Sequence, residues 1–65
     1  MNSINPIAFI RLPAITKMTS LSRSSIYRLI NTGDFPRQVQ LSTRTVAWRL
    51  TDVEHWISQK INQQH

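Results

Sequence analysis

The sequence predicts a mainly α-helical domain with a small β-hairpin, a winged helix-turn-helix in which a C-terminal helix follows a two-stranded wing. Two short stretches with helical apolar spacing are separated by only three residues, 19–21. So tight a connection makes two helices cross at a large angle. After Pro36 the apolar residues alternate, as in strands, and from residue 51 the helical spacing returns.

The two N-terminal helices have recognisable boundaries. Pro13 suits the first position of a helix over residues 13–19, because its missing N–H is not needed there. Ser22 is a favourable N-cap for the second helix, and Gly33 provides a left-handed stop after it. The predicted buried face of this second helix consists of Ile26, Leu29 and Ile30.

Residues 38–49 predict a hairpin with one apolar face. Val39 and Leu41 alternate with glutamines, and after a turn at residues 42–44 Val46 and Trp48 alternate with less apolar residues. A lone hairpin is marginally stable in water, so we expect it to pack on the helices.

The third helix is expected to begin with a capping box. Thr51 is the predicted cap, Glu54 follows three residues later, and Asp52 suits the positive end of the helix dipole. The predicted apolar face consists of Val53, Trp56, Ile57 and Ile61.

The size of the chain allows one domain. Its 65 residues include no cysteine, which excludes disulfides and thiolate zinc sites. We expect residues 1–8 to be a flexible lead-in, residues 9–61 to form the domain and residues 62–65 to be a tail. Neither a membrane span nor a signal-type N-terminus is recognised, which predicts a cytoplasmic, nucleoid-associated protein.

The charge balance favours a nucleic-acid partner. Eight basic residues stand against three acidic ones, for a net charge of +5, and six of the eight are arginine. The planar guanidinium group suits phosphates and guanine edges. A small basic domain can also be basic without such a partner, so charge alone leaves both interpretations open.

The second helix carries the main candidate site. A helical wheel places Ser24, Arg28 and Asn31 opposite the core, with Tyr27 and Ser25 on the flanks and Arg23 in the first turn. No acidic residue interrupts this face, which suits insertion among phosphates and base edges. Arg28 is the best candidate for a bidentate contact to guanine, whereas the serines, Tyr27 and Asn31 can equally serve packing or the helix ends.

Further basic residues lie outside this helix. Arg44, in the predicted hairpin tip, is expected to reach an adjacent minor groove or backbone, although a solvated turn residue is the simpler alternative. Lys17, Arg37 and Arg49 are candidates for contacts with the DNA backbone or for electrostatic steering.

Enzymatic chemistry is not expected. His55 and His65 lack further ligands at metal spacing, so no metal site or cofactor is predicted. Two of the three carboxylates are explained by helix capping, and the single glycine, Gly33, excludes a glycine-rich phosphate loop. No small-molecule substrate is implied.

Several motifs resemble a known family. The segments LSRSSIYRLI, GDFP and VAW, within residues 11–57, are similar to the AlpA family of prophage regulatory proteins, small winged-helix DNA-binding proteins related to MerR-type and excisionase-type folds. The resemblance implies a regulator of mobile-element genes, often of an integrase or of excision. It also implies recognition through Arg23, Ser24, Ser25, Tyr27 and Arg28, with Arg44 in the wing.

Two positions depart from the family pattern. Ser20 and Ser42 stand where members usually have glycine, and serine at a positive φ costs about 1 kcal/mol.

The leading hypothesis is therefore a sequence-specific binder of double-stranded DNA. A single module of this kind buries only about 600 to 1,000 Å², so we expect further copies to bind adjacent or repeated sites. An alternative is a protein-interaction adaptor that uses the same basic face on an acidic partner. RNA binding ranks lower, because the sequence lacks an exposed aromatic pair for stacking single-stranded bases.

Overall fold

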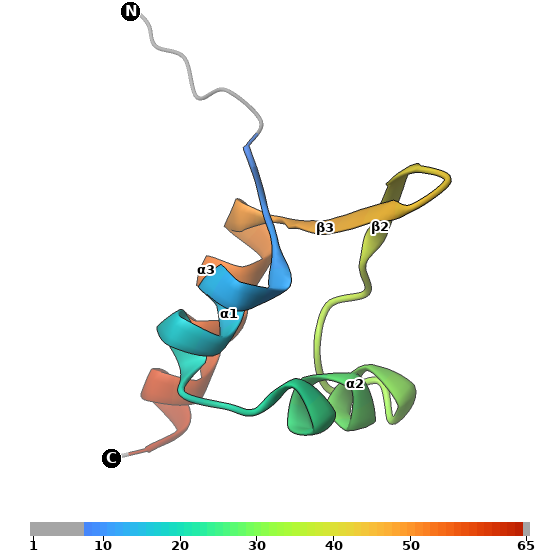
Figure 1. Ribbon diagram of the computed structural model, residues 1–65. Coiled ribbons are helices and arrows are strands. Elements are labelled where there is room, and N and C mark those ends of the chain that lie inside the picture. Colours follow the sequence, from blue (N-terminus) through green and yellow to red (C-terminus); the bar gives the residue numbers. More distant parts are fainter. Residues whose placement is uncertain (1–7, 65) are drawn as a thin grey trace, which may run out of the picture.

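The computed structural model describes residues 8–64 and confirms the predicted fold class, three helices with a small antiparallel sheet (Figure 1). The elements in chain order are β1 (Phe9–Ile10), α1 (Leu12–Thr19), α2 (Arg23–Asn31), β2 (Val39–Ser42), β3 (Thr45–Arg49) and α3 (Leu50–Gln63).

The turn between α1 and α2 is built by local hydrogen bonds and one left-handed residue. Ser20 has φ 63° and ψ 16°, and its N–H donates to the Thr16 carbonyl oxygen at 2.8 Å. The Thr19 hydroxyl donates to the Ile15 carbonyl oxygen at 2.8 Å and accepts from the Leu21 N–H at 3.2 Å. A left-handed serine therefore occupies the position where relatives were expected to carry glycine. Ser42 does not have a positive φ.

Both predicted ends of α2 are confirmed. The Ser22 hydroxyl accepts from the backbone N–H of Ser25 at 3.2 Å, as an N-cap does. After the helix, Gly33 has φ 82°, and its N–H donates to the Ile30 carbonyl oxygen at 3.1 Å.

The sheet contains one strand more than the predicted hairpin. The strand order is β1-β3-β2, with Phe9 opposite Arg49 and Val39 opposite Ala47. Two residues are too short for a recognisable alternation, which is why the sequence did not indicate β1. As the central strand, β3 buries Ala47 as well as Trp48.

The outer part of the hairpin leaves the core. Leu41, expected on the apolar face, is 45% exposed, because β2 is irregular between Gln40 and Ser42 and the hairpin extends beyond the helices (Figure 1). An irregularity of this kind changes the side to which the next residue points. We call the hairpin β2–β3, with its turn at residues 43–44, the wing.

The predicted capping box of α3 is wrong. The helix begins at Leu50, directly after β3, so Thr51 already has a helical backbone. Its N-cap is Arg49, without a side-chain cap. The Leu50 N–H instead donates to the carbonyl oxygen of Ala8 at 2.9 Å. Ala8 belongs to the predicted lead-in, of which residues 1–7 lie outside the described part of the chain.

The other end of α3 also differs from the prediction. The helix continues to Gln63, into the expected tail, and Ile61 is 65% exposed rather than part of an apolar face.

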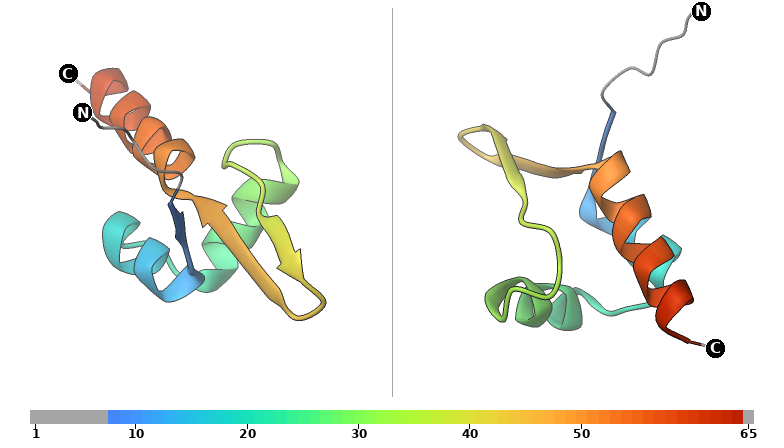
Figure 2. Two further views of the ribbon diagram at one scale, coloured as in Figure 1. Left: turned by 90° about the horizontal axis from the view of Figure 1, so that it is seen from above. Right: turned by 180° about the vertical axis from the view of Figure 1, so that it is seen from behind.

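The core lies where α1, α2 and α3 meet the sheet (Figure 2). Its buried residues come from every part of the fold except β1 and β2, and they are Ile15, Ile26, Ile30, Phe35, Trp48 and Val53. Trp48 is completely buried, and its indole N–H donates to the Pro36 carbonyl oxygen at 3.0 Å. No helix within residues 8–64 has the length and apolarity needed to cross a bilayer.

Candidate nucleic-acid interface

The helix α2 and the wing project from the same side of the molecule. In all three views they extend away from α1 and α3, which lie on the other side of the molecule (Figures 1 and 2). The buried face of α2, through Ile26 and Ile30, holds the helix against the core. The opposite face of α2 is thus left exposed.

The outward face of α2 is polar and contains no acidic side chain. The exposed residues are the ones that the helical wheel placed outward or in the first turn, namely Arg23, Ser24, Arg28 and Asn31. Within residues 8–64, the side chains of Ser24, Arg28 and Asn31 form no hydrogen bond or ion pair to the protein. These donors and acceptors are therefore available to an external ligand.

Ser25 has a different environment. It is half-buried, and its hydroxyl accepts a hydrogen bond from the Ser22 hydroxyl at 3.1 Å. The backbone N–H of Ser25 donates to the Ser22 hydroxyl, the N-cap of α2. Ser25 is therefore part of the helix start.

Tyr27 is half-buried and has packing contacts on both sides. Its ring lies edge to face with Trp48, with 6.3 Å between the centroids. The Arg23 guanidinium carbon lies 5.8 Å from the Tyr27 ring centroid, within cation–π range. Trp48 thus fixes Tyr27, which in turn orients Arg23 along the surface.

Arg11 is a basic residue that the sequence interpretation missed as a site candidate. It lines a pocket of about 500 Å³ between α1, α2 and β3, together with Arg23, Tyr27 and Thr16. The lining also includes the apolar side chains of Val46 and Trp48 from β3. Arg11 directly precedes α1, and its basic character was visible in the sequence; the pocket that it shares with Arg23 of α2 was not.

The other basic candidate residues lie on different parts of the fold. Arg44 is exposed in the turn that joins β2 to β3, and Arg37 is exposed in the loop before β2. Lys17 is exposed in the last turn of α1. Arg49 ends β3 at its far end from Arg44, and its Nε lies 4.0 Å from an Asp52 carboxylate oxygen. The structure therefore does not bring Arg49 and Arg44 together.

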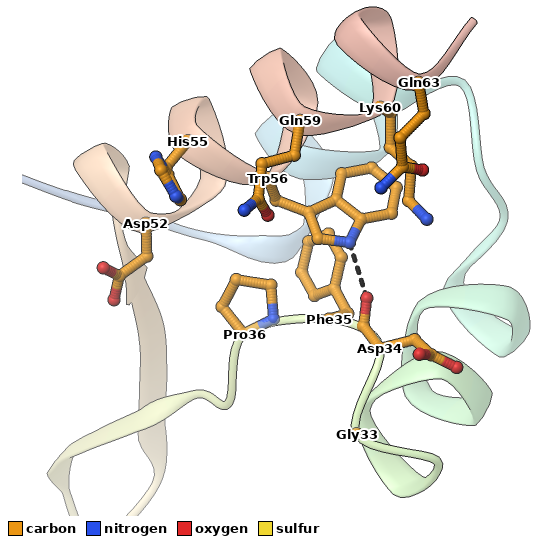
Figure 3. A pocket seen from close by; sticks show the side chains of 10 residues that line it. All are labelled: Gly33, Asp34, Phe35, Pro36, Asp52, His55, Trp56, Gln59, Lys60 and Gln63. Atoms are coloured by element: carbon orange, nitrogen blue, oxygen red, sulfur yellow. Dashed lines mark hydrogen bonds between the residues drawn. The ribbon is translucent and has the colours of Figure 1, made fainter.

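A second pocket, of about 460 Å³, lies between α3 and the loop after α2 (Figure 3). Its wall includes Trp56 and Phe35, whose rings are T-shaped with centroids 4.8 Å apart. The Trp56 indole N–H donates to the Asp34 carbonyl oxygen. His55 lines this pocket, but no group of three potential metal-ligating side chains occurs within residues 8–64.

The amino-acid sequence matches a known protein family over nearly all of the described residues. The family model described as prophage CP4-57 regulatory protein (AlpA) matches residues 8–61, from the residue before β1 to the last turns of α3. The chain belongs to the AlpA family. This is a family of regulatory proteins, in agreement with the resemblance found in the sequence.

Two relatives support this membership. The chain is 43% identical over 53 residues to the uncharacterized protein ORF88 of Enterobacteria phage P4, a match that covers 82% of this chain and 60% of that protein. It is 29% identical over 66 residues to the DNA-binding transcriptional activator AlpA of Escherichia coli K12, covering 92% of this chain and 94% of the relative. This AlpA-family chain thus spans less than two thirds of the phage protein but nearly all of the bacterial one.

Proposed function

We propose that this AlpA-family chain is a sequence-specific regulator of prophage genes that binds double-stranded DNA. One observation carries the proposal: α2, whose exposed residues include no acidic side chain, lies on the same side of the molecule as the wing, whose turn contains the exposed Arg44. This arrangement suits a helix in the major groove and a hairpin on the adjacent backbone or minor groove. The E. coli relative, a DNA-binding transcriptional activator, supports the same proposal.

The proposed role of each residue follows from its exposure and its contacts within the protein. Arg28, exposed and unpaired within the described chain, is the proposed reader of a guanine edge, because its guanidinium can donate two parallel hydrogen bonds. Ser24 and Asn31 are proposed to contact DNA on either side of it, and Arg23 to bind a phosphate. Ser25 and Tyr27 are proposed to act chiefly by holding α2 and Arg23 in place. The Tyr27 hydroxyl is also proposed to contact the DNA backbone.

Regulation would take place in the cytoplasm, on the nucleoid, through control of an integrase or through an excisionase-like bending of DNA. The small footprint of one module, about 600 to 1,000 Å², favours occupation of repeated sites by several copies. Arg37 and Lys17 would add attraction to the backbone without reading sequence.

The proposal is tested by fluorescence anisotropy on labelled duplexes that tile the gene's own locus, in a series of salt concentrations. We expect one tile to bind tightly, and Arg28→Ala to remove the preference for that tile. Arg28→Lys is the informative companion, because it keeps the charge and loses the planar fork. It should retain weak binding to all tiles without selectivity.

Lys60→Ala is the matched control, because it removes one positive charge from α3, outside the proposed interface. It should leave the choice of tile unchanged. If all tiles bound equally weakly, and Arg28→Ala behaved like Lys60→Ala, sequence reading would be refuted. The adaptor hypothesis, in which the basic face binds an acidic protein, would then be preferred.

A further inference from the structure

The tip of the wing lies outside the hydrophobic core. Residues 40–44 are all exposed, and Figure 1 shows the hairpin extending beyond the helices. Leu41, the apolar residue of this stretch, is 45% exposed. Burial therefore contributes little to the conformation of the tip, which depends on local hydrogen bonds.

The turn of the wing lacks the backbone geometry that two-residue hairpin loops prefer. Ser42 pairs with Thr45, so Thr43 and Arg44 form the loop. The favoured loops of this length, types I′ and II′, need a positive φ at one or both central residues and therefore usually contain glycine. Neither Thr43 nor Arg44 has a positive φ. Because other turn types fit the twist of the strands less well, this turn needs further support.

The irregularity in β2 weakens the hairpin at the same place. Gln40 lies opposite Val46. Two residues later, Ser42 lies opposite Thr45, the direct neighbour of Val46, so that β2 contains one residue more than β3 here. Such a bulge interrupts the regular hydrogen bonds between two strands. The pair next to the turn is thus separated from the regular part of the hairpin.

Gln40 supplies hydrogen bonds to this turn. Its side-chain amide nitrogen donates to the carbonyl oxygen of Ser42 at 2.6 Å and to that of Thr43 at 3.3 Å. An amide NH₂ group has two hydrogens to donate, so both contacts can form together. Within residues 8–64, no other side chain forms a hydrogen bond to the turn. One side chain therefore spans the bulge and holds the loop from the strand that precedes it.

We propose that Gln40 is a positioning residue for DNA binding: its amide holds the turn of the wing in shape and so presents Arg44 to the duplex. This inference rests on the proposed function, in which Arg44 contacts the adjacent backbone or minor groove. An arginine on a disordered tip loses conformational entropy when it binds, whereas an ordered tip has lost most of that entropy beforehand. Gln40 acts in this way without touching the DNA.

The first test measures the order of the wing in the free protein. Gln40→Met keeps the length of the side chain and removes the donor. The {¹H}–¹⁵N nuclear Overhauser effects of the Thr43 and Arg44 amides should fall in this variant, because they report motion on the picosecond to nanosecond timescale. Equal values in the wild type and in Gln40→Met would overturn the inference.

Gln38→Met is the matched control. Gln38 is also exposed, directly before β2, and its side chain forms no hydrogen bond within residues 8–64. The same substitution there should leave the order of the turn unchanged. If Gln38→Met loosened the turn as much as Gln40→Met, the hydrogen bonds of Gln40 would not be the cause, and the inference would fail.

The second test is a double-mutant cycle on the selected tile, measured by anisotropy. In the wild-type background, Gln40→Met should weaken binding by about 2- to 10-fold, in the range expected for the loss of one hydrogen bond. In the Arg44→Ala background the same substitution should change the affinity by less than about 2-fold, because no arginine remains to be positioned. Losses of equal size in both backgrounds would show that Gln40 contacts DNA itself, and would overturn the positioning role.

The two tests separate this inference from the proposed function. A turn loosened by Gln40→Met, in a protein that binds no tile selectively, would refute sequence reading and retain the role of Gln40 in ordering the wing. Selective binding to one tile, with an unchanged turn and independent effects of Gln40→Met and Arg44→Ala, would retain the function and overturn the inference.

Discussion

The indole N–H of Trp48 donates to the carbonyl oxygen of Pro36 at 3.0 Å, and this bond joins the central strand to the loop after α2. Trp48 is fully buried and also contacts Tyr27 of α2 edge to face. One side chain on β3 therefore sets how α2 lies relative to the wing. The relative placement of the two proposed DNA-binding elements depends on it.

Trp48→Phe should accordingly destabilise the protein. Loss of the indole leaves the Pro36 carbonyl without its donor, at a cost of about 1–3 kcal/mol. A domain of this size has a free energy of unfolding of only about 3–10 kcal/mol. Urea unfolding followed by far-ultraviolet circular dichroism measures the change. The control is Trp56→Phe, whose hydrogen bond to Asp34 is exposed, so that water can replace it. Equal losses for the two variants would contradict the role given to Trp48.

Ser20→Gly should stabilise the protein, because Ser20 has φ 63°. The left-handed conformation costs an L-residue about 1–2 kcal/mol, and the greater freedom of glycine in the unfolded chain offsets part of that gain. We expect a net increase of about 0.5–1 kcal/mol in the free energy of unfolding. Ser42→Gly is the matched control, since Ser42 lacks a positive φ and should gain nothing. A stabilised Ser42→Gly variant would show that the wing turn is strained.

Ser22→Ala and Thr51→Ala should have unequal effects on stability. The Ser22 hydroxyl caps α2, and its removal should cost about 0.5–2 kcal/mol. Thr51 is exposed within the first turn of α3 and caps nothing, so its substitution should change stability by no more than about 0.5 kcal/mol. Midpoints of urea unfolding compare the two. If Thr51→Ala lowered the stability as much as Ser22→Ala, the predicted capping box at Thr51 would be correct after all.

Arg11→Ala should weaken DNA binding evenly across sequences. Arg11 lines the pocket beside Arg23, and its side chain forms no cap on α1, so the substitution should leave the helix intact. We propose that Arg11 contacts a phosphate beside Arg23, and the loss of one such contact lowers the slope of log affinity against log salt by about one. Anisotropy titrations at several salt concentrations measure this slope. An unchanged slope, or a change in which tile is preferred, would show that Arg11 does not bind the backbone.

Much of this fold was predictable because its signals are local. The Ser22 cap, the Gly33 stop and the spacing of Ile26, Leu29 and Ile30 all act within one helix, and all are confirmed. The family was recognisable from short motifs for the same reason, and the match over residues 8–61 confirms it. The exposed face of α2 followed from the positions of its buried residues, although its contacts with DNA remain a prediction.

The predictions were wrong where contacts between segments far apart in the sequence determine the local structure. Thr51 and Glu54 have the pattern of a capping box, but β3 continues directly into α3 and pairs with β1, so the N-cap is Arg49 and the helix begins two residues earlier than predicted. Leu41 fits the apolar alternation of the sequence, but the irregularity in β2 between Gln40 and Ser42 leaves its side chain exposed. No local rule indicates that a two-residue strand will find its partner.

The sequence by itself determined the helix-turn-helix, the hairpin, the basic charge and the acid-free face of α2, because periodicity, capping and composition are properties of neighbouring residues. Only the tertiary structure decided that Tyr27 supports Arg23, that Arg11 joins them at one pocket, and that Asp34 and Asp52 share another with Trp56. These groups are far apart in the chain or on different elements. They meet because burial of Trp48 and Phe35 in one core leaves each element a single way to pack.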